Sequence, residues 1–417
     1  MDNLDAMERA GLNILRTLID NGYEAYFVGG YVRDKLLGRP IGDIDIATSA
    51  KPDEVMRIFE RHVPTGLQHG TVTVFSDEFP FEVTTFRTEA EYEQYRRPKS
   101  VQYVNNLHED LKRRDFTMNA MAMDAEGNVL DPFGGQADLK QKLLRCVGTA
   151  SDRFSEDALR MMRCIRFAAE YGLEVEEKTW QALLHHSEKL KHIAMERVRI
   201  ELEKMIEGSD PARAITLLQQ SGLLFRLNRD ILVPSHSLQR IIQHDSLLTA
   251  FNRVNGAAQR WYLFYMMLGM SSEISASSMQ RLTFSNAAKE AVVSMLRFNE
   301  ALAEKASDLR LHWIKNVLKF GAATAERWLH AHAMLPDSNL YTEKGAAWLE
   351  QMPVKHVQEL AVNGNDLKTL KAKSGPWIGK LMNEILLAAA SGVVPNEYEA
   401  QMQFAKNVLN GEKDEHQ

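Results

Sequence analysis

The stretch Tyr26–Ile46, YFVGGYVRDKLLGRPIGDIDI, contains a glycine pair and, further on, two aspartates separated by one residue. Gly29-Gly30 follows an apolar run that predicts a short strand, and the pattern of Tyr31–Leu37 predicts a short helix directly after the glycines. Glycine lets the backbone approach an anion closely, and the N–H groups at a helix start point toward it, with Arg33 one turn further on as a mobile positive charge. This half of the stretch therefore predicts a phosphate-binding turn at Gly30.

The aspartates Asp43 and Asp45 flank Ile44 in a second apolar run, which predicts another strand. Side chains alternate along a strand, so the two carboxylates project from one face with their roots about 7 Å apart. Their repulsion would cost roughly 0.6 to 2.4 kcal/mol at effective dielectric constants between 80 and 20. A divalent cation removes this cost, and hard oxygen ligands beside a phosphate-binding turn predict Mg²⁺ acting on a nucleoside triphosphate.

Taken separately, the glycine pair is compatible with an ordinary turn and the aspartates with a solvated strand face. Together they resemble the signature of the polymerase-β-like nucleotidyltransferases, in which a Gly-Gly or Gly-Ser turn precedes an Asp-x-Asp strand. The longer run GGYVRDKLLGRPIGDIDIAT resembles the form found in class II tRNA nucleotidyltransferases, the CCA-adding enzymes, and in bacterial poly(A) polymerases.

The composition is that of a globular protein without a membrane anchor. The chain has 417 residues, of which 45% are hydrophobic and 25% charged, and no apolar run reaches membrane length. Its first residues are acidic and lack an apolar signal core, so a cytoplasmic location is expected. Two cysteines predict neither a disulfide framework nor a zinc site. With a formal net charge of −6, binding of a polyanion requires that Lys and Arg cluster on one surface.

The first 140 residues predict a domain that mixes strands and helices. Strand patterns at Thr71–Phe75 and Phe81–Phe86 follow those described above, with a helix near Asp53–Arg61. Glu82 lies in the middle of FEVTTF, either on an exposed strand face or within reach of the metals on the neighbouring strand. The resemblance implies that Glu82 is the third catalytic carboxylate beside Asp43 and Asp45.

Two further segments of this domain match the family. The range 87–106 has no periodicity and is polar, which predicts a loop without regular structure; the resemblance implies that it helps the site to change from C to A addition. The run LKRRDFTMNA resembles the RRDFTxNA motif, which implies that Arg114 contacts the nucleotide. Asp115 and Asn119 are expected to brace the turn or to bind a ribose hydroxyl, not to take part in the chemistry.

Beyond residue 140 only helices are predicted. FSEDALRMMRCIRFAAEYG predicts one helix with Ser155 as its N-cap, and an acid and three arginines recur every three residues along one side. This stripe is compatible with a solvated face. Three arginines with few compensating acids also predict a surface that binds a polyanion. The segment resembles the EDxxRxxR motif, which implies that Asp157 and Arg160 select the base and that Arg163 and Arg166 contact the nucleotide.

Such a pair of side chains is chemically suited to the two bases. Cytosine and adenine both present an amino donor beside a ring-nitrogen acceptor, which an aspartate and an arginine complement, whereas guanine and uracil reverse the two roles. An unpaired buried group costs about 1.5 to 3 kcal/mol, on the order of tenfold to 150-fold in discrimination.

Two later segments are also interpreted. The helix MERVRIELEKMIEG predicts a structural brace with i, i+4 pairs Arg197–Glu201 and Arg199–Glu203. Lysines cluster around a Gly-Pro that opens a helix near the end of the chain, which is compatible with a solvated helix pair or with a grip on an RNA backbone; they are Lys368, Lys371, Lys373 and Lys380. The resemblance implies the second role.

The fold class expected is α+β, with a small mixed sheet followed by an all-helical remainder. The expected domains are a catalytic head at 1–140, a neck at 141–205, a body at 206–310 and a tRNA-binding tail at 311–417. The resemblance implies addition of C, C and A to tRNA lacking its 3′ CCA, from CTP and ATP with Mg²⁺, by a monomer or homodimer. A poly(A) polymerase, a CC-only or A-only enzyme, and a non-catalytic RNA-binding protein remain alternatives.

Overall fold

A computed structural model describes residues 2–89, 92–93, 97–98, 101–227, 245–336, 339–371 and 375–414. The chain divides into two compact units, Met1–Ile231 and Leu232–Gln417. The four-part division expected from the sequence is finer than this grouping and stays a prediction. Within the described residues, no helix combines the length and apolar character needed to cross a lipid bilayer.

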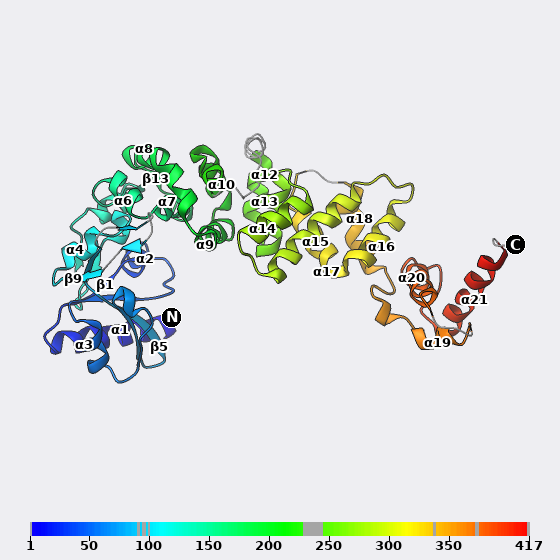
Figure 1. Ribbon diagram of the computed structural model, residues 1–417, viewed down its shortest axis with the longest axis horizontal. Coiled ribbons are helices and arrows are strands. Elements are labelled where there is room, and N and C mark those ends of the chain that lie inside the picture. The colour runs from blue at the N-terminus through cyan, green and yellow to red at the C-terminus, as the bar shows by residue number, and fades with distance from the viewer. Residues whose placement is uncertain are drawn as a thin grey trace. The chain divides into compact units, whose positions relative to one another are not determined.

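The first unit contains a mixed sheet, in which β1 and β5 are labelled in Figure 1. The strand order of this sheet is β11-β10-β1-β2-β5-β4-β3. Strands β2 and β5 run parallel, and every other neighbouring pair is antiparallel. The strands are β1 Ala25–Val28, β2 Asp45–Thr48, β3 His62–Val63, β4 Thr71–Ser76, β5 Phe79–Thr85, β10 Ala122–Met123 and β11 Val129–Leu130. The expected mixed sheet is confirmed.

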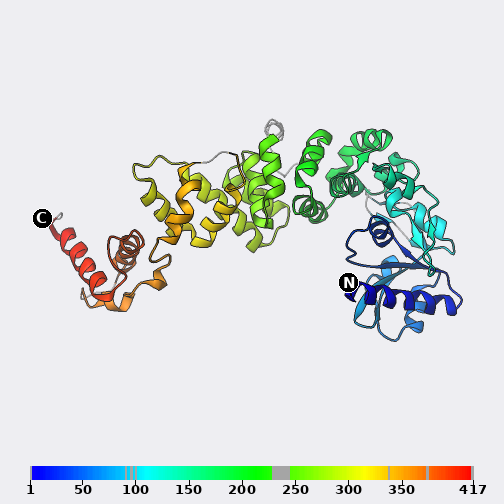
Figure 2. The same cartoon turned by 180° about the vertical axis from the view of Figure 1, so that it is seen from behind.

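Helix α1, Asp2–Asp20, lies across this sheet, as Figure 2 shows. Its Gly11 is required by packing, because a Cβ there would lie 3.0 Å from the ring of Phe27 and 3.1 Å from that of Phe81. The other helices of the sheet domain are α2 Gly30–Leu36, α3 Pro52–Ile58, α4 Leu107–Lys112 and α5 Gly135–Lys140, with the 3₁₀ turns η1 Leu67–His69 and η2 Thr117–Asn119.

The range 87–106 contains short strands, so the expectation of a loop without regular structure is wrong. β6 Arg87–Glu89 pairs antiparallel with β9 Val101–Tyr103, and β7 Tyr92–Glu93 pairs with β8 Arg97–Pro98. These strands are only two or three residues long, which is too short to produce a recognisable hydrophobic period in the sequence.

The described rest of the first unit is helical, as expected, apart from a small parallel pair that the sequence did not predict, β12 Leu143–Leu144 and β13 Glu174–Val175. Helix α7 packs against α9 and α10, and α6 packs against α8. The bounds are α6 Ala150–Glu156, α7 Leu159–Glu170, α8 Glu177–His186, η3 Ser187–His192, α9 Met195–Ile206, α10 Pro211–Ser221 and η4 Leu223–Arg226.

Every regular element in the described part of the second unit is helical. Its core contains the large buried side chains Phe298, Trp313 and Trp328. Its elements are α12 Asp245–Arg253, α13 Ala257–Met267, α14 Ser272–Arg281, α15 Asn286–Leu302, α16 Leu309–Phe320, α17 Ala322–His332, α18 Leu340–Glu350, η5 Val357–Glu359, α19 Gly364–Lys368, α20 Trp377–Ala390 and α21 Tyr398–Asp414. A mixed sheet followed by helices confirms the α+β class.

Candidate active site

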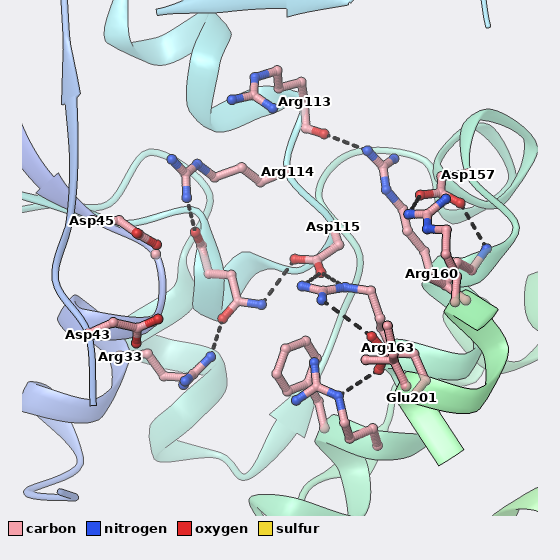
Figure 3. A pocket seen from close by; sticks show the side chains of 18 residues that line it. Arg33, Asp43, Asp45, Arg113, Arg114, Asp115, Asp157, Arg160, Arg163 and Glu201 are labelled. Carbon is pink, nitrogen blue, oxygen red and sulfur yellow. Dashed lines mark hydrogen bonds and ion pairs between the residues drawn. The ribbon is translucent and has the colours of Figure 1, made fainter. Parts of the chain in front are cut away.

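A cavity of about 650 Å³ in the first unit gathers residues from five segments of the chain (Figure 3). Its walls come from the glycine turn, the start of β2, the segment after α4, and the facing helices α7 and α9. Seven arginines and five acids line it, together with six other residues: Arg33, Arg113, Arg114, Arg160, Arg163, Arg166 and Arg197; Asp43, Asp45, Asp115, Asp157 and Glu201; Gly29, Gly30, Asn119, Leu159, Phe167 and Ile200. A chain of net charge −6 thus concentrates positive charge at one place, as binding of a polyanion requires.

The two predicted metal ligands stand at one end of this cavity. Asp45 is the first residue of β2, Ile44 before it is buried, and Asp43 is exposed, as alternation along an extended segment requires. The pKa of Asp45 is raised to about 6, first by burial and then by the negative charges of Asp43 and Glu82, against the opposing effect of Arg114. The protein therefore holds carboxylates together at an electrostatic cost that a cation would remove.

Glu82 lies beside this pair but is absent from the cavity wall. It is the direct ladder partner of Asp45 in the parallel pairing of β2 with β5, and its side chain is exposed. The predicted proximity of the three carboxylates is therefore found. A supporting electrostatic role suits this position of Glu82 better than direct contact with a nucleotide in the cavity.

The carboxylates of Asp43 and Asp45 fit a hard cation whose remaining ligands come from a bound nucleotide and water. Among the described residues, no three His, Cys, Asp or Glu side chains are grouped as a ready-made metal site. Mg²⁺ is commonly bound by one or two carboxylates, with water and substrate phosphate oxygens completing its shell. Asp43 and Asp45 supply such a partial set beside an arginine-lined cavity.

The glycine turn brings backbone, cation and carboxylate together. Gly29 has φ 71° and ψ −128°, a conformation in which an L side chain is strained. A Cβ at this position would lie 3.0 Å from Nη1 of Arg114 and 3.9 Å from Oδ2 of Asp45. Helix α2 begins at Gly30, one residue before the predicted start at Tyr31, so its first backbone amides belong to this end of the cavity.

Arg33 is held in place, so the expectation of a mobile charge is wrong. Its guanidinium donates from Nε and Nη2 to the carboxylate of Asp34, at 3.0 and 2.7 Å, and from Nη1 to Oδ1 of Asn119 at 2.6 Å. The ring of Tyr171 lies 4.4 Å from its central carbon, and the Tyr171 hydroxyl donates to Asp34 at 3.0 Å. A cation fixed in this way is preorganised toward the cavity that it lines.

Asp115 and Asn119 brace the turn after α4, as predicted. Oδ1 of Asp115 accepts from the Phe116 amide at 2.8 Å and from Nδ2 of Asn119 at 3.0 Å, while Oδ2 accepts from Nε of Arg163 at 2.8 Å. Burial alone would raise the pKa of Asp115, but Arg163 and Asn119 outweigh it and hold that pKa well below its usual range. Asp115 is thus an anchor that carries its negative charge at neutral pH.

The single helix predicted with Ser155 as N-cap is interrupted. Helix α6 ends at Glu156 and α7 begins at Leu159, so Ser155 lies inside α6 and accepts a hydrogen bond from Lys189. At the break, Asp157 accepts from the Leu159 amide at 3.0 Å and from Nη2 of Arg197 at 3.1 Å. No glycine or proline marks the two residues between α6 and α7, which is why the break was not predicted.

Arg160 is buried and anchored on three sides. Its Nη1 donates to Oε2 of Glu156 at 2.7 Å and to the Arg153 carbonyl at 3.2 Å, and its Nη2 donates to the Arg113 carbonyl at 2.9 Å. Asp157 and Arg160 therefore stand on the same cavity as Asp43 and Asp45, which is the juxtaposition that the sequence interpretation required.

The arginine stripe has more acid partners than expected. Arg163 pairs with Asp115 at 2.6 Å, and Arg166 pairs with Glu201 at 2.7 Å and with Glu170 at 2.9 Å. Both guanidinium groups lie over the ring of Phe167, at 5.0 and 3.9 Å. The expectation of few compensating acids is therefore wrong.

Helix α9 forms part of the cavity wall, which the sequence analysis missed. Arg197 binds Asp157 instead of the predicted Glu201, whereas the predicted Arg199–Glu203 pair is present at 2.6 Å. Glu201 is 4% exposed and stands on the apolar face of α9 with Val198 and Leu202. The sequence did contain a signal for this role of α9, namely an acid on the apolar face of an amphipathic helix. A buried carboxylate needs a cationic partner, so this acid indicated that arginines from another element pack against α9.

The lysine cluster belongs to the second unit and is described separately. Lys368 ends α19 and donates to Asn365 at 2.8 Å, Lys371 lies 5.2 Å from the ring of Trp377, and Lys380 is in α20. Lys373 lies outside the described residues. RNA binding by this cluster stays a prediction.

The fold and the cavity define a nucleotidyltransferase with a polymerase-type head. Residues 25–145 match the family described as "Poly A polymerase head domain", residues 172–232 match "Probable RNA and SrmB- binding site of polymerase A", and residues 253–405 match tRNA nucleotidyltransferase domain 2. Nucleotidyltransferases of this kind are metal-dependent.

The similarity to individual proteins extends over nearly the whole chain. The chain is 41% identical to the CCA-adding enzyme of Geobacillus sp. (strain WCH70) over 96% of this chain and 98% of that protein. It is 42% identical to that of Bacillus cereus (strain Q1) over 93% and 95%. The crystal structure of the Bacillus stearothermophilus CCA-adding enzyme in complex with CTP matches with a TM-score of 0.84 and 35% identity over 98% of both chains. The chain belongs to the family of CCA-adding enzymes.

Proposed function

We propose that this chain adds C, C and A to the 3′ end of tRNA lacking them, using CTP and ATP and releasing pyrophosphate. The observation that carries the proposal is that one cavity has the carboxylates of Asp43 and Asp45 at one end and the pair Asp157 and Arg160 at the other. Such a cavity suits a nucleotide whose triphosphate and base are bound at opposite ends. We also propose that the reaction takes place in the cytoplasm and that the body and tail, including the lysine cluster, bind the tRNA.

Asp43 and Asp45 would hold Mg²⁺, with Glu82 supporting them electrostatically. When bound, the metal would make the attacking 3′-hydroxyl more acidic and neutralise charge on the transferring phosphoryl group and pyrophosphate. The chain's own contribution is to direct the two carboxylates to one side, while Arg114 limits the rise in the pKa of Asp45.

Gly30, Arg33 and Arg114 would bind the triphosphate and sugar. Arg33 is already fixed by Asp34 and Asn119, so little side-chain entropy would be lost when a phosphate oxygen binds. Arg114 lies over the glycine turn, where backbone amides and guanidinium converge. These fixed cations would keep the α-phosphorus in line with the attacking hydroxyl.

Asp157 and Arg160 would select the base, with Arg163 and Arg166 as further nucleotide contacts. Asp157 accepts hydrogen bonds and Arg160 donates them, which complements the amino group and ring nitrogen shared by cytosine and adenine. Arg197 orients Asp157 from α9, and Glu156 orients Arg160. The protein would thus read the base without a nucleic-acid template.

Incubation of the chain with a tRNA that ends before its CCA is the direct test. With CTP and ATP together, we expect three added nucleotides in the order C, C, A; with CTP alone, we expect two. Addition of a long A tract would instead identify a poly(A) polymerase, and addition of C alone or A alone would identify a partial enzyme. A chain that binds tRNA but adds nothing would be a non-catalytic RNA-binding protein.

The shifted pKa of Asp45 predicts pH-dependent cation binding. The folded-state pKa of about 6 exceeds the usual 3.8, so the folded chain holds a proton that the unfolded chain releases between these values. Protonation of this carboxyl therefore stabilises the folded chain at low pH, and this stabilisation is lost as the pH rises through 6. Above pH 6 a bound cation can take the place of the proton. We expect Mg²⁺ to raise the melting temperature more at pH 7.5 than at pH 5. The Asp45→Asn variant should lose this pH dependence; equal Mg²⁺ effects in both proteins would contradict the assignment.

A further inference from the structure

Asp110, in the first turn of α4, binds two adjacent arginines of the cavity through one buried carboxylate. The residue is 1% exposed. Its Oδ1 accepts from Nε and Nη2 of Arg113, at 3.0 and 2.9 Å, and its Oδ2 faces Nη2 of Arg114 at 3.3 Å. The backbone amide of Arg87 also donates to Oδ1, at 3.3 Å. The cavity wall includes Arg113 and Arg114 but not Asp110, which stands behind them.

Through Arg114, this carboxylate reaches the phosphate end of the cavity. The same guanidinium donates from Nη1 to the Asn119 carbonyl at 3.4 Å and lies 3.0 Å from the Cβ position of Gly29. Asp110 and Asn119 thus hold the two Nη atoms of Arg114 from separate segments. A planar guanidinium held at both nitrogens has one orientation over the glycine turn.

Through Arg113, the same carboxylate reaches the base end. The Arg113 side chain folds back onto Asp110, while its backbone carbonyl accepts the 2.9 Å hydrogen bond from Nη2 of Arg160. Arg160 is itself only 8% exposed, so its position depends on the few groups that it contacts. By binding the Arg113 side chain, Asp110 therefore fixes the position of the Arg113 carbonyl that accepts the hydrogen bond from Arg160.

We propose that Asp110 is a positioning residue that sets, through Arg114 and Arg113, both the triphosphate contact and the base-reading contact of this enzyme. The inference rests on the proposed function of Arg114 and Arg160. One acid serving two arginines leaves a net positive charge on the cavity side, which suits a triphosphate. Burial alone would raise the pKa of Asp110, but Arg113, Arg114 and the Arg87 amide outweigh it and lower that pKa, so the carboxylate remains charged.

The test compares Asp110→Asn with Asp138→Asn in the full chain. Asp138 is a matched control because it is also 1% exposed, also pairs with an arginine, Arg145, and accepts from the Thr117 hydroxyl at 2.6 Å, but does not line or back the cavity arginines. Equilibrium binding of CTP and UTP, measured without tRNA, gives affinity and base discrimination separately from transfer. Thermal unfolding reports the stability loss of each variant.

For Asp110→Asn we expect CTP binding to weaken about tenfold and the CTP-to-UTP affinity ratio to fall by at least about fivefold, because two arginines lose their charged partner. Asp138→Asn should lose comparable stability but keep the wild-type ratio. If Asp110→Asn loses stability while its CTP affinity and ratio stay at wild-type values, Asp110 is a structural ion pair and the inference is overturned.

A second variant covers the case in which Asp110→Asn does not fold. Arg113→Met removes the side chain that binds Asp110 but keeps the backbone carbonyl that accepts from Arg160, and it leaves the Asp110–Arg114 pair. The peptide that Arg160 contacts is then no longer held by Asp110, so the affinity ratio should fall more than CTP affinity does. An unchanged ratio in Arg113→Met would overturn the inference. A wild-type chain that binds CTP over UTP yet transfers nothing to tRNA would overturn the proposed function alone.

Discussion

Replacement of Asp45 by alanine is expected to lower the rate of nucleotide incorporation into tRNA by about 10³-fold or more, about 4 kcal/mol of transition-state stabilisation. The reason is that Asp45 supplies one of two carboxylates that would hold the metal, and phosphoryl transfer depends on neutralising charge around the phosphorus. Asp43→Ala should have an effect of the same order. Glu82→Gln should cost less, roughly tenfold, because Glu82 neighbours Asp45 in the ladder but does not line the cavity.

Stability should move in the opposite direction from activity. The pKa of Asp45 is raised, so its ionised form destabilises the folded chain above pH 6. Asp45→Ala should therefore keep or raise the melting temperature at pH 7.5 without added metal, while activity falls. This combination separates a functional carboxylate from a structural one, whose removal lowers both.

Asp53→Ala is the matched control, because Asp53 is an exposed aspartate on α3 of the same domain and does not line the cavity. It should retain wild-type incorporation. Single-turnover incorporation and thermal unfolding are the two measurements. Near-normal turnover in Asp45→Ala would remove the metal assignment, and a parallel loss of stability and activity would make Asp45 a structural residue.

The sequence predicted the parts of this site that are local in the chain. Gly29-Gly30, Asp43 and Asp45 follow from turn chemistry and strand alternation within one short stretch, and the structure places them at one end of a cavity. The spacing of Arg160 and its neighbours likewise predicted an arginine-bearing helix face. These signals are carried by residues a few positions apart, where backbone geometry decides which side chains share a face.

The interactions that fix those side chains were not predictable in the same way. Arg197 binds Asp157 across 40 residues of sequence, Arg166 binds Glu201 across 35, and Arg33 binds Asn119 across 86. A pattern within a helix favours the local i, i+4 partner, which is why Arg197 was paired with Glu201 in the sequence interpretation. Packing of α7 against α9 overrides that preference by burying the acids next to cations from another element.

Replacement of Asp157 by asparagine is expected to reduce discrimination of CTP over UTP by roughly tenfold to 150-fold, with a smaller effect on the rate of C addition. A carboxylate only accepts hydrogen bonds, whereas an amide both donates and accepts. Asparagine can therefore complement the carbonyl oxygen that uracil presents where cytosine has its amine. Arg160→Lys should have a related effect, because lysine keeps the charge but not the planar fork that Glu156 and the Arg113 carbonyl hold in place.

Two matched controls accompany this test. Asp152 is exposed on α6, and Arg199 pairs with Glu203 on α9 without lining the cavity. Asp152→Asn and Arg199→Lys should keep the wild-type ratio of kcat/KM for CTP and UTP, measured with a tRNA that ends before CCA. Asp157 also has a structural role at the break between α6 and α7, because its Oδ1 accepts a hydrogen bond from the Leu159 amide. The Oδ1 of an asparagine can accept the same hydrogen bond, so the variant keeps this role. Lost discrimination with an intact helix start would therefore be an effect on the base, whereas an unchanged ratio would mean that Asp157 only caps α7 and that the base is read elsewhere.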